Sequence, residues 1–122
     1  MTITFYGIAN CNTVRKARAW LRDNALDYAF HDFKREGADQ DLVRSWVQAL
    51  GWERVLNRQG TTFRKLEPEQ QENLDAEKAI RLMVAQPSCI RRPVVDHPGG
   101  LLVGFDEREW AAALGPGSGT AG

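Results

Sequence analysis

One cysteine at the start of a predicted helix is the residue best placed to do chemistry. Cys11 follows a strand-like segment and the turn Gly7-Ile8-Ala9-Asn10, and a helical pattern runs over Thr13–Asp23. The unpaired backbone N–H groups and the dipole at a helix N-terminus favour an anion. A thiolate is an anion, so we expect the pKa of Cys11 to fall below the value of about 8.5 of a free cysteine.

Basic and polar neighbours add to this expectation. Arg15 lies four residues after Cys11 and therefore on the same helix face. Lys16 brings a second positive charge, Thr13 a hydroxyl group and Asn10 a polar side chain. The alternative is a buried and inert cysteine, which is common for this residue type. The local electrostatics favour a reactive thiolate.

Other patterns that carry chemistry are weaker. His31 lies in a strand-like run and His97 in a turn, without the spacing of metal ligands, so we expect no metal site. The segment Gly60-Thr61-Thr62 lacks the pattern of a phosphate-binding loop and is interpreted as a tight turn.

The elements around Cys11 predict an α/β fold. Strand-like runs at Thr2–Tyr6 and Tyr28–Phe33 flank the first helix, which makes a β-α-β unit with parallel strands and a right-handed crossover. Val94–Asp96 and Leu101–Val103 flank the turn His97-Pro98-Gly99-Gly100 and predict an antiparallel hairpin, and a last helix covers Glu107–Leu114.

A helical block separates these two parts. Its expected helix starts are Asp39 or Asp41, Pro68 after Glu67, and Asp75. A helical insertion between two such halves is one way to build a four-stranded mixed sheet. The Gly- and Ser-rich segment Gly115–Gly122 is predicted to be disordered.

Composition limits the classes of function. The chain has 122 residues, enough for one domain, and 16 basic residues balance 16 acidic ones. No global field therefore argues for nucleic acid or an anionic membrane. The first residues do not resemble a signal peptide, and no apolar run has the roughly 18 residues of a membrane span. With two cysteines, we expect free thiols in a reducing cytoplasm.

Three segments together resemble one family. They are Tyr6-Gly7-Ile8-x-Asn10-Cys11-x-Thr13-x-Arg15-Lys16-Ala17, Leu56-Asn57-Arg58-x-Gly60-Thr61-Thr62-Phe63-Arg64-Lys65-Leu66, and Ile90-Arg91-Arg92-Pro93-Val94. In this order, with Gly104-Phe105 after them, they resemble the arsenate reductase (ArsC)/Spx family, and especially its YffB-like branch. The resemblance covers roughly residues 2–114.

The resemblance implies a fold and a set of site residues. The fold is α/β, a thioredoxin-like mixed four-stranded sheet with a helical insertion, in a single domain over residues 1–114. The implied nucleophile is Cys11, with glutathione as the source of reducing power and as co-substrate. Binding of the substrate or of glutathione would involve Asn10, Thr13, Arg15, Arg58, Arg92 and Pro93, the last as a cis-proline. Guanidinium groups hold oxyanions and carboxylates in bidentate geometry, which suits these arginines.

Departures from the family pattern narrow the function. Arsenate reductases of this family carry a histidine at the position of Gly7 and a third arginine near the position of Phe105. Spx regulators carry a second cysteine at the position of Val14. The oxyanion pocket is therefore short of cations, and a disulfide within the helix is impossible.

Two hypotheses follow from different classes. The first is a glutathione-dependent thiol reductase, expected as a cytoplasmic monomer, that acts on a small anionic or disulfide substrate, with glutaredoxin as a further candidate partner and no metal. The second is an Spx-like regulator that binds RNA polymerase without turnover; a weak arsenate reductase remains a third reading. Cys89 lies in an apolar segment just before Arg92-Pro93 and is expected to be a packed core thiol, although its proximity to Cys11 stays open.

Overall fold

The structure is a computed structural model that describes residues 2–115, so the predicted disordered tail lies outside the described residues except for Gly115. Contacts divide the chain into two compact units. One contains the residues up to Asp32 together with those from Arg92 onward, and the other is Phe33–Arg91. The second unit is the helical insertion that the sequence predicts. The prediction of one domain over residues 1–114 stays a prediction.

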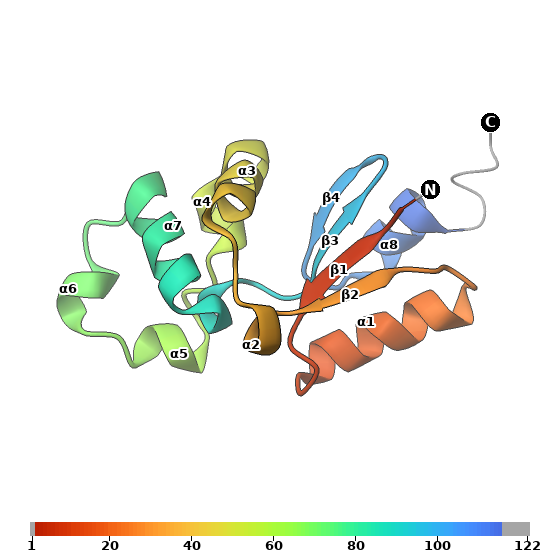
Figure 1. Ribbon diagram of the computed structural model, residues 1–122, viewed down its shortest axis with the longest axis horizontal. Coiled ribbons are helices and arrows are strands. Elements are labelled where there is room, and N and C mark those ends of the chain that lie inside the picture. The colour runs from red at the N-terminus through yellow and green to blue at the C-terminus, as the bar shows by residue number, and fades with distance from the viewer. Residues whose placement is uncertain (1, 116–122) are drawn as a thin grey trace. The chain divides into compact units, whose positions relative to one another are not determined.

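The first unit is built on a mixed four-stranded sheet in the order β2-β1-β3-β4 (Figure 1). Its strands are β1 (Thr4–Gly7), β2 (Ala29–Asp32), β3 (Val94–His97) and β4 (Gly100–Val103). Strand β1 pairs parallel with β2 and antiparallel with β3, and β3 pairs antiparallel with β4. The β-α-β unit and the hairpin are therefore confirmed, and they meet at β1.

Two helices, α1 (Asn12–Asp23) and α8 (Glu107–Leu114), share one apolar core with this sheet. The buried residues of the core are Ile3, Phe5, Val14, Ala17, Leu21, Val95, Leu102 and Trp110. The Trp110 ring contacts Phe5, Trp20 and Phe105 edge to face, and its Nε1 donates a hydrogen bond to the Gly104 carbonyl at 3.0 Å. The partner for the indole N–H is what allows this large ring to be fully buried.

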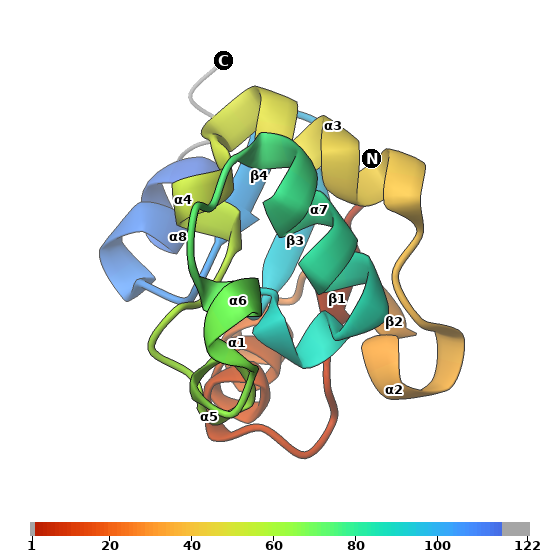
Figure 2. The ribbon, with the colours of Figure 1, turned by 90° about the vertical axis from the view of Figure 1, so that its left-hand side faces the viewer.

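Among the residues described, the second unit consists of helices, their connections and one isolated antiparallel β-bridge between Leu56 and Ile90. The helices are α2 (Phe33–Glu36), α3 (Gln40–Leu50), α4 (Trp52–Val55), α5 (Thr61–Arg64), α6 (Pro68–Gln71), α7 (Ala76–Ala85) and the 3₁₀ helix η1 (Pro87–Cys89). Helices α3 and α7 pack against each other, as Figure 2 shows, and Arg44 of α3 pairs with Glu77 of α7.

Side-chain caps explain where the longer of these helices begin. The carboxylate of Asp39 accepts a hydrogen bond from the backbone N–H of Leu42 at 3.0 Å, and that of Asp75 accepts one from Lys78 at 2.8 Å. Of the two predicted caps for α3, Asp39 is therefore correct and Asp41 lies inside the helix. Glu67 and Pro68 begin α6, as the sequence predicts.

Two local predictions are wrong. The second strand ends at Asp32, and Phe33 instead begins α2, where its ring contacts Trp46. The segment Gly60-Thr61-Thr62 is more than a tight turn, since Thr61 begins the single-turn helix α5. In both cases the turn of helix buries an aromatic side chain, Phe33 or Phe63. One helical turn leaves too little periodicity to be seen in sequence.

Candidate active site around Cys11

Cys11 lies at the junction between the turn after β1 and helix α1. Its backbone is extended, with φ −136° and ψ 128°, and its carbonyl accepts the first hydrogen bond of the helix, from the N–H of Arg15 at 2.9 Å. The residue is partly exposed and its side chain is a free thiol. It therefore occupies the N-cap position that the sequence predicts, where helix N–H groups face an anion.

Opposing influences act on the pKa of Cys11. Partial burial alone would raise that pKa. Three groups lower the pKa: the backbone N–H of Val14, the guanidinium of Arg92 through a hydrogen bond and its charge, and the backbone N–H of Thr13. Their combined effect is larger than that of burial. The pKa of the thiol is thus below its ordinary value, which gives a larger thiolate fraction at neutral pH.

Arg92 and Pro93 reach this site from the other end of the chain. The peptide bond between them is cis, as the resemblance implies, and Pro93 is buried. The Pro93 carbonyl accepts a hydrogen bond from the N–H of Gly104 at 2.8 Å, at the end of β4. Strand β3 pairs with β1 directly after this bond, and β1 leads into the turn that holds Cys11. The sheet thereby brings a guanidinium group to the thiol.

The guanidinium of Arg15 is bonded to side chains next to Cys11, and its role in binding a substrate or glutathione stays a prediction. Its Nη1 donates to Asn12 Oδ1 and its Nη2 to Asn10 Oδ1, both at 2.8 Å. These two bonds hold the guanidinium against the turn that precedes α1. Arg92, and not Arg15, is the cation that lowers the pKa of Cys11. The side chain of Asn10 accepts a hydrogen bond from Arg15, and the backbone N–H of Thr13 helps to lower the pKa of Cys11.

Two predicted residues belong to the other unit. Arg58 is exposed, and its guanidinium lies 5.4 Å from the centre of the Trp52 ring. Its role in holding a substrate stays a prediction. Cys89 is 1% exposed, and its carbonyl accepts a hydrogen bond from Asn57 at 2.7 Å. The prediction of a packed core thiol is therefore confirmed.

Within residues 2–115, no group of three or more His, Cys, Asp or Glu side chains is arranged to hold a metal ion. No helix in the described part of the chain is long and apolar enough to span a bilayer.

Comparison with known proteins identifies the family. The model of the ArsC family matches residues 6–113. The chain belongs to the ArsC family. A solved structure of the YffB (PA3664) protein is 51% identical, covers 93% of this chain and 99% of its own, and superposes with a TM-score of 0.90. The fold is accordingly the thioredoxin-like fold of that family.

Two relatives show how broad the family is. An uncharacterised protein of Haemophilus influenzae is 36% identical over 92% of this chain and 98% of its own length. The global transcriptional regulator Spx of Streptococcus pyogenes is 29% identical over 92% of this chain and 84% of its own length.

The structure shows what surrounds the three positions at which the resemblance indicates a departure from the family pattern. A Cβ atom added at Gly7, the histidine position of the arsenate reductases, would lie 3.0 Å from Val14 Cγ2 and 3.3 Å from Phe5 Cε1. Phe105, near their third arginine, stacks edge to face on Trp110 with the ring centres 4.9 Å apart. Val14, the second-cysteine position of Spx, is fully buried in the core. All three positions serve packing in this chain, so none offers a cation or a second thiol.

Proposed function

We propose that this ArsC family member is a glutathione-dependent thiol reductase with the Cys11 thiolate as its nucleophile. The observation that carries the proposal is the environment of the thiol. Helix N–H groups and Arg92 lower the pKa of Cys11, and the residue is only partly buried. A thiolate of lowered pKa at a helix N-terminus is the arrangement that thiol–disulfide exchange needs.

The reaction proceeds in two exchanges. The Cys11 thiolate attacks the glutathione sulfur of a mixed disulfide, forms a Cys11–glutathione disulfide and releases the substrate as a thiolate. The thiolate of a second glutathione then attacks the glutathione sulfur of this adduct, releases the Cys11 thiolate and forms oxidised glutathione. Over both exchanges one disulfide bond is broken and one is formed. The sulfur of the second glutathione is oxidised from thiol to disulfide, the substrate sulfur is reduced from disulfide to thiol, and the first glutathione stays at the disulfide level throughout.

The arginines hold the negative charges of these partners. Arg92 stabilises the Cys11 thiolate in the attacking and in the leaving state, since both are anionic. Arg15 retains donors beyond the two bonds to Asn10 and Asn12 and can bind a glutathione carboxylate. Arg58 is proposed for the second carboxylate. The chemistry fits the reducing cytoplasm, where glutathione is abundant and both cysteines stay free.

Mass spectrometry after incubation with oxidised glutathione tests the proposal. We expect one glutathione adduct per chain, located on the Cys11 peptide and removed by added glutathione. The Cys11→Ser variant should take up none, and the Cys89→Ala variant should react like the wild type because Cys89 is buried. Absence of an adduct on Cys11 at any oxidant concentration would refute the proposal.

A second candidate function rests on the similarity to Spx over most of both chains. In that case the chain would bind RNA polymerase through its surface, without turnover and without need of the thiol. Purified RNA polymerase offered to the wild type and to Cys11→Ser separates the two hypotheses. Equal stoichiometric binding by both, together with no glutathione exchange, would favour the regulator.

A further inference from the structure

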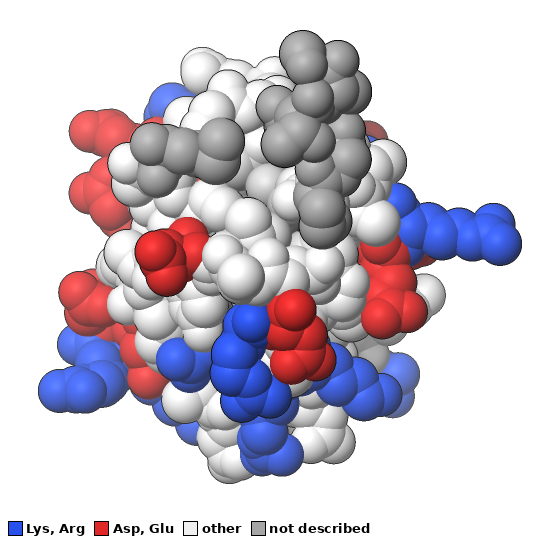
Figure 3. Space-filling model, turned by 90° about the vertical axis from the view of Figure 1, so that its right-hand side faces the viewer, with Lys and Arg blue, Asp and Glu red and all other residues white. Residues whose placement is uncertain are grey.

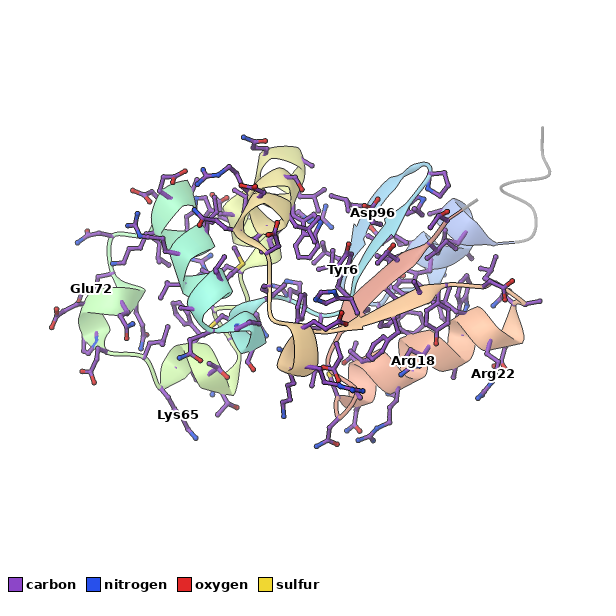
Figure 4. The ribbon with its side chains drawn as sticks, viewed as in Figure 1. Tyr6, Arg18, Arg22, Lys65, Glu72 and Asp96 are labelled. Carbon is purple, nitrogen blue, oxygen red and sulfur yellow. The ribbon has the colours of Figure 1, made fainter. Side chains whose placement is uncertain are left out.

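A groove lies along one side of helix α1, next to the segment that connects α1 to β2. It has a volume of about 710 Å³, and its lining residues are Arg15, Arg18, Ala19, Arg22, Ala25, Leu26, Asp27 and Tyr28. Arg18 and Arg22 follow one another along α1 in Figure 4. The three arginines are spaced three and four residues apart, so they form one row on the helix surface.

The guanidinium of Arg18, in the middle of this row, is held in one orientation by two contacts. Arg18 Nε donates to the hydroxyl oxygen of Tyr28 at 2.8 Å, and the guanidinium lies 4.1 Å from the centre of the Phe30 ring. These two contacts fix the plane of the guanidinium and leave both Nη groups for an incoming acceptor. A guanidinium fixed in this way loses little freedom when it binds a carboxylate in bidentate fashion.

The charge of the groove is unbalanced. Among the residues that the structure describes, neither Arg15 nor Arg18 has a carboxylate within ion-pair distance, and Arg22 meets only Asp23, at 3.7 Å and with both side chains exposed. The one acidic residue in the lining is Asp27, against three arginines. In Figure 3, basic side chains lie over the lower part of the face that it draws, with some acidic ones among them.

The length and position of the row indicate what it binds. Arg15 to Arg22 spans seven residues of helix, about 10 Å, which matches about three residues of extended polypeptide. The row begins one helical turn after Cys11. The floor of Ala19, Leu26 and Tyr28 is partly apolar, which suits the side-chain stems of a peptide better than a bare anion.

We propose that this arginine groove binds an acidic, extended segment of a protein substrate whose disulfide reacts at Cys11. This inference rests on the proposed reductase function and names its substrate class: proteins with Asp or Glu residues close in sequence to the reacting cysteine. The balanced overall charge of the chain, 16 basic against 16 acidic residues, disfavours a nucleic acid as the occupant.

Binding is measured first without thiol chemistry. A fluorescein-labelled peptide with three Glu residues and no cysteine is titrated with the reduced full chain at low salt, and a peptide with Gln in place of each Glu serves as its partner. Arg18→Gln should weaken binding of the Glu peptide about tenfold, as expected for loss of a charge-assisted hydrogen bond. The exposed Arg22→Gln should weaken it about threefold, and raised salt should weaken it further.

The control is Arg108→Gln, which removes the same charge from an exposed site on α8 of the same unit. It should leave binding of the Glu peptide unchanged. If circular dichroism shows that Arg18→Gln is misfolded, Arg18→Lys replaces it. This variant keeps the charge but lacks the bidentate guanidinium, and should weaken binding of the Glu peptide to an intermediate degree. Equal binding of the Glu and Gln peptides, or equal losses in Arg18→Gln and Arg108→Gln, would overturn the proposal. Tighter binding of a single-stranded oligonucleotide of the same charge would overturn it as well.

A second measurement separates this inference from the proposed function. Glutathionylated peptides with Glu or Gln beside the cysteine are offered to the enzyme, and the rate of transfer to Cys11 is followed. Faster transfer from the Glu peptide supports both proposals. Exchange at equal rates from both peptides refutes the groove and leaves the reductase intact. Binding of the Glu peptide that depends on Arg18, with no exchange at Cys11, refutes the reductase and supports an acidic ligand in the groove.

Discussion

Removal of Arg92 should shift the reactivity of Cys11 to higher pH. Burial raises the pKa of the thiol, and Arg92 counters it with both a hydrogen bond and its charge. A charge-assisted hydrogen bond contributes about 1.5–3 kcal/mol where it is well buried. Cys11 and Arg92 are both only partly buried, so solvent screening reduces this by roughly half. Arg92→Ala should therefore remove about 0.8–1.5 kcal/mol of stabilisation from the thiolate and raise the pKa of Cys11.

The rate of iodoacetamide labelling against pH measures this shift. The rate follows the thiolate fraction, so it rises with pH through the pKa of the thiol. The wild-type midpoint should lie below about 8.5, the value of a free cysteine, and the midpoint of Arg92→Ala should lie to its alkaline side. Peptide mapping assigns the label to Cys11, and the buried Cys89 should stay unlabelled in the folded protein.

Two variants make the test specific. Arg92→Lys keeps the positive charge and should recover part of the shift. Arg15→Ala removes the exposed arginine that is bonded to Asn10 and Asn12, and should move the midpoint much less than Arg92→Ala does. A shift in Arg15→Ala as large as that in Arg92→Ala would mean that the intrahelical arginine sets the pKa. A wild-type midpoint at or above that of a free cysteine would refute the activation of Cys11 altogether.

Three further predictions concern glutathione, arsenate and the second cysteine. Arg58→Ala should slow glutathionylation of Cys11 about tenfold, by loss of a charge-assisted hydrogen bond, whereas the exposed Arg81→Ala should not; equal rates in the two variants would remove Arg58 from the site. Arsenate turnover in an NADPH assay coupled through glutathione and glutaredoxin should stay well below the roughly 1 per second of an ordinary enzyme, and Gly7→His should destabilise the protein without restoring it, because the added Cβ meets the core. Oxidation with diamide followed by non-reducing peptide mapping should yield no Cys11–Cys89 peptide, and Cys89→Ala should keep nearly full glutathione reactivity; a high yield of the linked peptide would change the mechanism to a dithiol one.

Local signals determined much of the architecture. The single strands and the helix of the β-α-β unit, the hairpin, the last helix at Glu107–Leu114 and the helix caps Asp39 and Asp75 are each indicated by residues within a few positions of each other. A capping carboxylate reaches the N–H group three residues ahead, so sequence alone can reveal it. The placement of Cys11 at a helix N-terminus is of the same local kind. The sequence did not predict the single-turn helices α2 and α5, because each buries one aromatic side chain and has no repeating apolar pattern.

The cation that lowers the pKa of Cys11 was decided by the tertiary structure. Sequence proximity favours Arg15, yet its guanidinium is bonded to Asn10 and Asn12, and Arg92 arrives beside the thiol because β3 pairs with β1. The arginine groove likewise depends on the tertiary structure. The row on α1 is visible in the sequence, but its floor and the contacts that fix Arg18 come from Tyr28 and Phe30 beyond the helix. Helix spacing determines which residues share a face, whereas strand pairing determines what that face meets, and strand pairing joins residues that are far apart in the chain.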